Sequence, residues 1–179
     1  MRIIAGTARG LKLKTPRGMA TRPTADRIKE SLFNNLACMI DFSRRRVLDL
    51  FAGSGALGLE SLSRGASAAT FIDRSSTDCI IDNAQRAHFD CVEVIRADVF
   101  RAFERLSERQ FDLIFVDPPY HMGLAQRAVE LVIEKNLLAS DGLMIVEIGA
   151  DEKIISTLER LRREDYGRTT AIEIFGRTT

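Results

Sequence analysis

The chain has 179 residues, a length that fits one compact domain and leaves little room for a second. Hydrophobic residues make up 45% and charged residues 28%, as in ordinary globular proteins, and no run approaches the ~20 apolar residues that span a bilayer. The basic N-terminus lacks the apolar core of a signal peptide, and the three cysteines form no C-x-x-C pair. We therefore expect a cytoplasmic protein without a membrane segment, a disulfide framework or a metal site.

The net charge of +1 conceals an uneven distribution along the chain. Residues 1–46 contain eleven Lys and Arg against three acids, so this part carries +8 and the remainder carries −7. Such a basic segment favours contact with the phosphates of a nucleic acid, although a solvated charged face is the plainer alternative. We expect residues 1–45 to form a basic N-terminal extension and residues 46–179 the core, together making one structural unit.

The predicted elements begin with a small β-hairpin over 2–16, followed by an amphipathic helix over 24–40. From residue 46, short apolar runs alternate with longer amphipathic ones, the pattern of a mostly parallel sheet with helices on both faces. The expected fold class is therefore α/β. Predicted strands cover 46–51, 68–73, 92–98, 111–117, 142–149 and 169–176, the last antiparallel after a turn at Tyr166-Gly167. Predicted helices cover 56–64, 75–87, 99–107, 123–136 and 152–163.

A glycine-rich loop follows the strand predicted over 46–51. Gly53, Gly55 and Gly58 match G-x-G-x-x-G between a strand and a helix, and Asp73 lies about 20 residues beyond the first glycine, where an acid can bind ribose hydroxyls. In open sheets of this kind, ligands bind beyond the carboxyl ends of the strands. The pattern therefore indicates a nucleoside-binding site, which leaves a nicotinamide-dependent dehydrogenase as one reading.

Asp49 favours a different nucleoside. It lies within the first predicted strand, where a dinucleotide enzyme usually has apolar residues. A carboxylate at this place suits a ligand with an α-amino group, and S-adenosylmethionine has that group but lacks the pyrophosphate that a helix N-terminus would neutralise. Asp49 thus favours a methyl donor.

The sequence Asp117-Pro118-Pro119-Tyr120 ends the strand predicted over 111–117. An exocyclic amine on a base is a poor nucleophile, because its lone pair is delocalised into the ring. The Asp117 carboxylate and the Pro118 carbonyl can each accept one N–H and so direct the lone pair at a methyl group, while Tyr120 can stack on the base. The motif predicts methyl transfer to a base amine; the alternative is a strand-ending turn with a core tyrosine.

Four segments together resemble a known family. LDLFAGSGALGLESLSRGA, RPTADRIKESLFN, DPPY and RIIAGTARGLKLKTP are similar to the bacterial 16S rRNA (guanine(966)-N(2))-methyltransferases over nearly the whole chain. DPPY alone also occurs in adenine-N6 and cytosine-N4 enzymes, whereas the basic opening and RPTADRIKESLFN are more specific. The resemblance implies the Rossmann-like class I methyltransferase fold, S-adenosylmethionine as donor, S-adenosylhomocysteine as product and a guanine amino group of small-subunit rRNA as acceptor.

The same resemblance assigns roles by position. The amino-acid part of the donor would contact Asp49, Ala52, Gly53 and Gly55, its ribose Asp73, and its adenine Asp98 and the amide of Val99. Thr24 and Arg27 belong to a segment that closes over the donor, and Asp117, Pro118 and Tyr120 are the catalytic set. Expected phosphate contacts are Arg9, Lys12, Lys14, Arg17 and Arg22. Asp98 can equally serve as the N-cap of the helix that follows it.

Two further alternatives stay open besides the dehydrogenase. One is an adenine- or cytosine-specific nucleic-acid methyltransferase that uses the same DPPY chemistry. The other is a ribosome-assembly binding module in which methyl transfer is secondary. The expected partner is 16S rRNA, in the small subunit or an assembly intermediate, and the absence of an obvious apolar stripe makes a monomer the default expectation.

Overall fold

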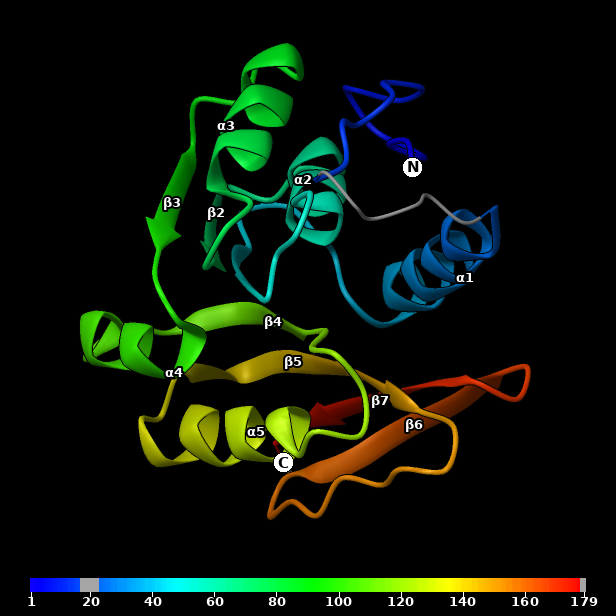
Figure 1. The fold of residues 1–179 in the computed structure, drawn as a ribbon, viewed down its shortest axis with the longest axis vertical. Coiled ribbons are helices and arrows are strands. Elements are labelled where there is room, and N and C mark those ends of the chain that lie inside the picture. Colours follow the sequence, from blue (N-terminus) through cyan, green and yellow to red (C-terminus); the bar gives the residue numbers. More distant parts are fainter. Residues whose placement is uncertain (17–22, 178–179) are drawn as a thin grey trace.

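The computed structural model describes residues 1–16 and 23–177, and its centre is a seven-stranded sheet (Figure 1). The strands are β1 (Arg46–Leu50), β2 (Ala68–Asp73), β3 (Val92–Arg96), β4 (Phe111–Val116), β5 (Leu138–Gly149), β6 (Glu159–Tyr166) and β7 (Thr170–Gly176). They lie in the order β3-β2-β1-β4-β5-β7-β6. β1 to β5 pair in parallel, and β7 pairs antiparallel with both β5 and β6. The expected α/β class with a mostly parallel sheet is confirmed.

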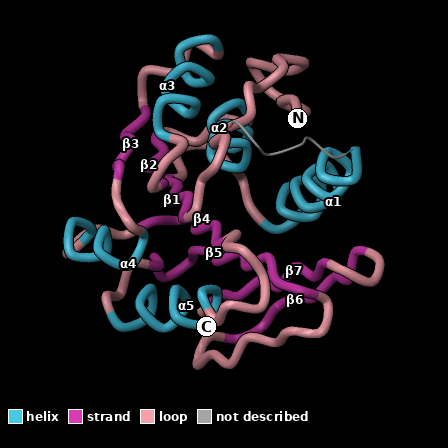
Figure 2. Tube along the Cα trace, viewed as in Figure 1, coloured by secondary structure: helices cyan, strands magenta, loops and turns pink. Residues whose placement is uncertain are grey.

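The helices cover both faces of this sheet, as Figure 2 shows. They are α1 (Pro23–Met39), α2 (Ala56–Ser63), α3 (Thr77–Arg86), α4 (Val99–Ala102) and α5 (Leu124–Glu134). Because successive strand residues point to opposite faces, the strands supply two apolar cores. Phe71 and Phe115 pack with α1, α2 and α3, whereas Ile72 and Val116 pack with α4 and α5. None of the helices in the described part of the chain is long and apolar enough to cross a membrane.

Gly58 sets the distance between α2 and the sheet. A Cβ atom at this position would lie 2.3 Å from Cε1 of the buried Phe71 ring on β2. We predict that Gly58→Ala lowers the free energy of unfolding by about 1–3 kcal/mol through overpacking. At an unobstructed helical site Gly→Ala raises the free energy of unfolding by roughly 0.5–1 kcal/mol. Urea unfolding of Gly58→Ala therefore shows, by whether this free energy falls or rises, whether α2 packs closely on Phe71. A stabilised variant would contradict the close packing.

The N-terminal segment doubles back on itself and packs on the core. An isolated antiparallel bridge joins Arg2 to Lys12, and the Ile3 amide donates to the Leu11 carbonyl at 3.0 Å. The chain therefore turns back on itself as the β-hairpin predicted over 2–16 requires, but it forms a single bridge in place of two regular strands. Ile3 and Leu13 are buried in the same core as α1 and α2. The backbone of this basic segment is thus held against the core, while the Arg9, Lys12 and Lys14 side chains remain exposed.

One predicted element is wrong. Residues 152–163 were expected to form a helix because Ile154, Ile155, Leu158 and Leu161 recur at helical spacing. The structure instead places β6 at the edge of the sheet, where Arg160 and Arg163 reach the buried Glu173 of β7 at 3.0 and 2.8 Å. The strand is fixed by this cross-strand partner, which no local pattern reveals, and Ile155 is left 82% exposed. A smaller difference is that the helix expected over 99–107 is α4 followed by a 3-10 turn at Phe103–Leu106.

Candidate active site

The carboxyl edge of the sheet gathers four aspartates from four strands. Asp49 lies in β1, Asp73 ends β2, Asp98 follows β3 and Asp117 follows β4. Asp49 pairs with Phe71 of β2 and Phe115 of β4, so Asp73 and Asp117 both stand two residues beyond it along neighbouring strands. The strand order reverses between β1 and β4, and in open α/β sheets this switch point is where ligands bind.

The loop from Phe51 to Gly55 is bent tightly at the end of β1. Phe51, Gly53 and Gly55 have φ angles of 61°, 55° and 76°, in the left-handed region that glycine adopts without strain and phenylalanine does not. The Ala52 amide donates to the Ile72 carbonyl at 3.0 Å, which ties the loop to the end of β2. A strained residue held in this way is typical of ligand-binding turns.

Asp73 is fixed by three backbone amides. Its Oδ2 accepts from the Gly53 amide at 2.9 Å, and its Oδ1 accepts from the Ser75 and Ser76 amides at 2.8 and 2.7 Å. The side chain is only partly buried. Each carboxylate oxygen has two acceptor positions, so Oδ2 of Asp73 can still accept one hydrogen bond from a hydroxyl of a ligand such as a ribose.

Asp49 is a buried carboxylate with one hydrogen bond. Its residue is 1% exposed, and Oδ2 accepts from the Gly58 amide at 2.9 Å. Burial raises the pKa of Asp49 to about 7, with a further contribution from the charge of Asp73. A nearby cation favours the ionised form of such a carboxyl group. The α-amino group that the sequence assigns to Asp49 would be such a cation.

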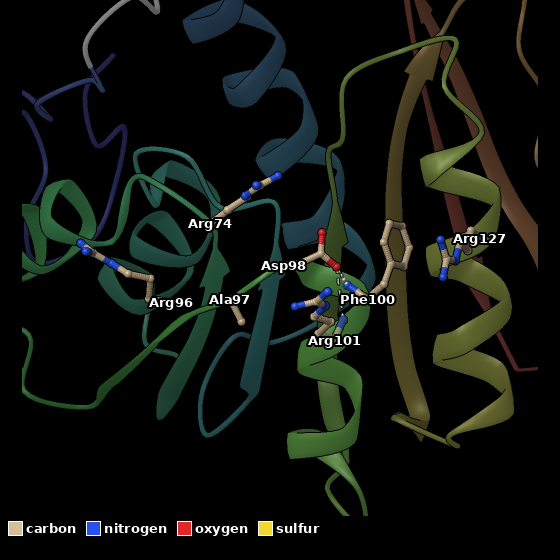
Figure 3. Close-up of a pocket in the computed structure, with 7 residues that line it drawn as sticks. All are labelled: Arg74, Arg96, Ala97, Asp98, Phe100, Arg101 and Arg127. Carbon is tan, nitrogen blue, oxygen red and sulfur yellow. Dashed lines mark hydrogen bonds between the residues drawn. The ribbon is translucent and has the colours of Figure 1, made fainter.

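A cavity of about 720 Å³ opens beside the N-terminus of α4 (Figure 3). Its lining side chains include Arg74, Arg96, Asp98, Phe100, Arg101 and Arg127. Asp98 caps α4, because its Oδ1 accepts from the Phe100 and Arg101 amides at 3.1 and 3.3 Å. Asp98 is therefore the N-cap of α4, as one of its two interpretations predicted, and its Oδ2 atom takes no part in the cap. Contact of Asp98 and the Val99 amide with an adenine stays a prediction.

The DPPY segment continues from β4 into a polar cluster that includes a residue missed by sequence reasoning. The Tyr120 hydroxyl donates to Oε1 of Glu147 on β5 and lies 3.2 Å from Oγ1 of Thr170 on β7. Val116 pairs with Val146, so Asp117 and Glu147 are the next residues of neighbouring strands. Glu147 was hidden because it lies in an apolar run, LMIVEIG, that reads simply as a buried strand.

The two carboxyl groups of this cluster both resist ionisation. Burial raises the pKa of Asp117 well above its ordinary value, and the charges of Glu147 and Asp49 add to the effect. Burial also raises the pKa of Glu147, although the hydrogen bond from Tyr120 opposes it. Two neighbouring carboxyl groups with raised pKa values can share one proton, and the N–H donors of a ligand would stabilise their ionised forms.

Of the remaining predicted residues, those that the structure describes belong to α1 and the N-terminal segment. Arg27 is exposed on α1, Thr24 belongs to the first turn of α1, and Arg17 and Arg22 lie outside the described residues. The buried Asn83 of α3 joins this segment to the glycine-rich loop, since its Nδ2 donates to the carbonyls of Lys14 and Ser54 at 2.9 and 3.0 Å. Among residues 1–16 and 23–177, no group of three or more His, Cys, Asp or Glu is placed to hold a metal ion.

This strand order, with a glycine-rich loop after β1 and acids ending the neighbouring strands, defines the Rossmann-like fold of the class I methyltransferases. The family model described as conserved hypothetical protein 95 matches residues 1–175. The putative rRNA methyltransferase YlbH of Bacillus subtilis is 37% identical over 177 residues, covering 94% of this chain and 95% of that protein. The ribosomal RNA small subunit methyltransferase D of Escherichia coli K12 is 40% identical over 149 residues, covering 82% and 74%.

A solved structure of a putative methyltransferase has the same fold as this chain. The putative methyltransferase yhhF of Escherichia coli superposes with a TM-score of 0.86 at 34% identity, covering 99% of this chain and 97% of that one. The chain therefore belongs to the conserved hypothetical protein 95 family, and its similarity to proteins named as rRNA methyltransferases confirms the resemblance drawn from its motifs.

Proposed function

We propose that this protein transfers a methyl group from S-adenosylmethionine to the exocyclic N2 amine of a guanine in 16S rRNA of the small ribosomal subunit. The observation that carries the proposal is the placement of Asp117 and Glu147 as neighbouring acceptors beside the buried Asp49 at the switch point of the sheet. The names of the relatives, small subunit rRNA methyltransferases among them, support rRNA as the substrate.

The residues of the carboxyl edge fit the donor. Asp49 would hold its ammonium group, Asp73 a ribose hydroxyl, and Asp98 with the Val99 amide its adenine. The loop from Ala52 to Gly55 lies between them, with the amides of Ala52, Gly53 and Gly55 already donating to Ile72, Asp73 and Ala52. We place Thr24 and Arg27 at the margin of this site. When bound, S-adenosylmethionine supplies an electrophilic methyl group on a sulfonium that leaves as a neutral thioether.

The pKa of Asp49 makes donor binding depend on pH. Because its folded-state pKa is raised to about 7, the ionised form that binds an ammonium group is the minor form at pH 6. We predict that donor affinity rises about tenfold between pH 6 and pH 8, and that binding below pH 7 releases a proton. Calorimetric titration in buffers of different ionisation enthalpy measures both effects.

Asp49→Asn is the control for this titration. It should bind the donor weakly at every pH. A group whose pKa is raised on folding binds its proton more tightly in the native state, so ionisation of Asp49 lowers the free energy of unfolding as pH rises from about 4 to about 7. Asp49→Asn should remove this pH-dependent decrease. A wild-type affinity that does not change with pH would contradict the assignment of Asp49.

The acceptor half of the site is built for an amine. The Asp117 carboxylate and the Pro118 carbonyl accept the two N–H bonds of the N2 group, which orients its lone pair for attack. As the new N–C bond forms, the amine loses a proton, and the raised pKa of Asp117 suits that group to receive it. Tyr120, anchored by Glu147 and Thr170, presents its ring as a platform on which the base can stack.

Guanine fits the paired carboxyl groups better than adenine or cytosine does. The Watson–Crick edge of guanine presents the N2 amine and the N1–H donor side by side, whereas adenine and cytosine place a ring acceptor next to their amine. Asp117 can accept from N2 and Glu147 from N1–H, so neither acceptor is left buried and unpaired. With Glu147 ionised, an adenine in the same position would set the lone pair of its ring nitrogen against the carboxylate.

The exposed cations of the N-terminal segment are proposed to contact rRNA phosphates. Arg9, Lys12 and Lys14 are exposed, Lys14 being paired with Asp82 at 3.1 Å, and we include Arg17 and Arg22 from the adjoining residues. We predict that Arg9→Glu with Lys12→Glu weakens rRNA binding by about tenfold or more at low salt and lowers the salt dependence. Filter binding at several salt concentrations measures this. Unchanged rRNA affinity would refute the role of the segment, and donor affinity should not change.

The experiment that tests the function is transfer of labelled methyl from S-adenosylmethionine to unmethylated small subunits, to naked 16S rRNA and to duplex DNA. Label in the small subunit or its rRNA supports the proposal. Label in DNA alone would indicate a DNA methyltransferase, and subunit binding without any label would indicate an assembly module. Binding of NADH in place of S-adenosylmethionine would indicate a dehydrogenase.

A further inference from the structure

The cavity beside α4 is rimmed by arginines from four separate segments (Figure 3). Arg74 follows β2, Arg96 ends β3, Arg101 lies in α4 and Arg127 lies in α5. They stand on the part of the chain that carries a net charge of −7, so their concentration at one cavity is not a consequence of composition. A cavity rimmed by cations on a domain of net negative charge attracts anions locally.

Three of these arginines are free to bind an anion. Arg96 is engaged, because it contacts Asp78 at 2.7 Å and Thr77 at 2.6 Å. Arg74, Arg101 and Arg127 are exposed, and within the described part of the chain no acidic side chain lies within ion-pair distance of them. Arg127 has its guanidinium 4.1 Å from the centroid of the Phe100 ring, which holds it at the cavity.

The methyl donor does not account for these charges. S-adenosylmethionine carries a sulfonium and an ammonium against one carboxylate, so it is a net cation, and it has no phosphate. The adenine proposed to contact Asp98 in this cavity is uncharged, and the amino-acid part of the donor, which carries the ammonium and the carboxylate, is assigned to the site of the buried Asp49, so no part of the donor offers an anion for the arginines at the rim to bind. The guanidinium group is instead suited to phosphate, which it binds through two parallel N–H bonds.

We propose that Arg74, Arg101 and Arg127 form a second RNA-binding surface, which grips backbone phosphates on the side of the substrate nucleotide opposite the N-terminal segment. The proposal rests on the proposed rRNA substrate and deepens it. The N-terminal segment packs on α2 and α3, while this surface lies at the β2, α4 and α5 margin of the sheet edge. The RNA strand therefore crosses the carboxyl edge between two groups of cations, with the target base turned down toward Asp117.

The test compares Arg74→Glu/Arg101→Glu with Arg105→Glu/Arg168→Glu. The control pair makes the same change of charge at exposed arginines on the 3-10 turn and on the β6–β7 turn. Binding to unmethylated small subunits is measured over a range of salt concentrations, and binding of S-adenosylhomocysteine is measured by calorimetry. If Arg74→Glu/Arg101→Glu unfolds at a lower temperature than the wild type, Arg74→Gln/Arg101→Gln replaces it in the comparison, because it removes the two charges without reversing them.

We expect the site variant to bind subunits about tenfold or more weakly at low salt, with a salt slope reduced by about 1.4, while the control pair and the affinity for S-adenosylhomocysteine stay unchanged. Unchanged subunit affinity would overturn the inference, as would a loss of S-adenosylhomocysteine affinity equal to the loss of subunit affinity. If the wild-type protein binds subunits without methylating them, the proposed function fails, and the comparison of the variants still decides whether this surface binds RNA.

Discussion

Asp117→Ala should lower kcat by about 10²- to 10³-fold while leaving the affinity for S-adenosylmethionine within a few-fold of wild type. The side chain accepts a hydrogen bond from the reacting amine, and loss of one well-placed group that stabilises the transition state has this magnitude. Single-turnover methylation of small subunits gives the rate, and calorimetry gives donor affinity. Asp151→Ala removes an exposed carboxylate just beyond β5 and should leave both quantities unchanged.

Folding stability separates a catalytic loss from a structural one. Because the pKa of the partly buried Asp117 carboxyl is raised on folding, its ionisation lowers the free energy of unfolding as pH rises above the unfolded-state pKa. Removing it should therefore leave the free energy of unfolding at neutral pH unchanged or greater. A variant of normal stability and normal turnover would remove Asp117 from the mechanism.

Glu60→Ala should lower the free energy of unfolding by about 3–5 kcal/mol. Glu60 is fully buried in α2, and its carboxylate accepts from the amides of Ile4 and Ala5 at 2.7 and 3.1 Å and pairs with Lys29 and Arg64 at 3.2 and 2.9 Å. Without it, the buried Lys29 ammonium is unpaired and two amides lose their acceptor. Urea unfolding measures the loss.

The same change should release the N-terminal segment. Limited trypsin digestion should cleave Glu60→Ala faster at Arg9, Lys12 and Lys14 than it cleaves the wild type, because their backbone is no longer held. Glu93→Ala, which breaks the exposed pair with Arg109 at 2.8 Å, should cost less than about 1 kcal/mol and leave this cleavage unchanged. Equal effects of the two substitutions would contradict the role of Glu60 as the attachment point.

The sheet edge could be predicted from the sequence because its signals are local. The glycine-rich loop, Asp49, Asp73 and DPPY each follow or lie within an apolar run, and parallel strands bring their carboxyl ends to one edge. The placement of Asp49 between Asp73 and Asp117 follows from the same arrangement.

Features that depend on partners distant in the chain could not be predicted. β6 is fixed by Glu173 on the next strand, whereas the apolar residues at helical spacing that predicted a helix, Ile154 and Leu158 with Leu161, lie mostly before the strand begins. Glu147 is joined to Tyr120 across 27 residues, and Asn83 to Lys14 across 69. In each case the decisive interaction joins a buried or partly buried polar group to a hydrogen-bond partner that it meets only in the folded chain.

The central claim is tested most directly by nucleoside analysis of small-subunit rRNA after incubation with the protein and labelled S-adenosylmethionine, using subunits that lack guanine-N2 modification. The account predicts that the label elutes as N2-methylguanosine and that Asp117→Ala abolishes most of it. Label in methylated adenosine or cytidine would contradict the assignment of guanine, and the absence of label would contradict the methyl-transfer function itself.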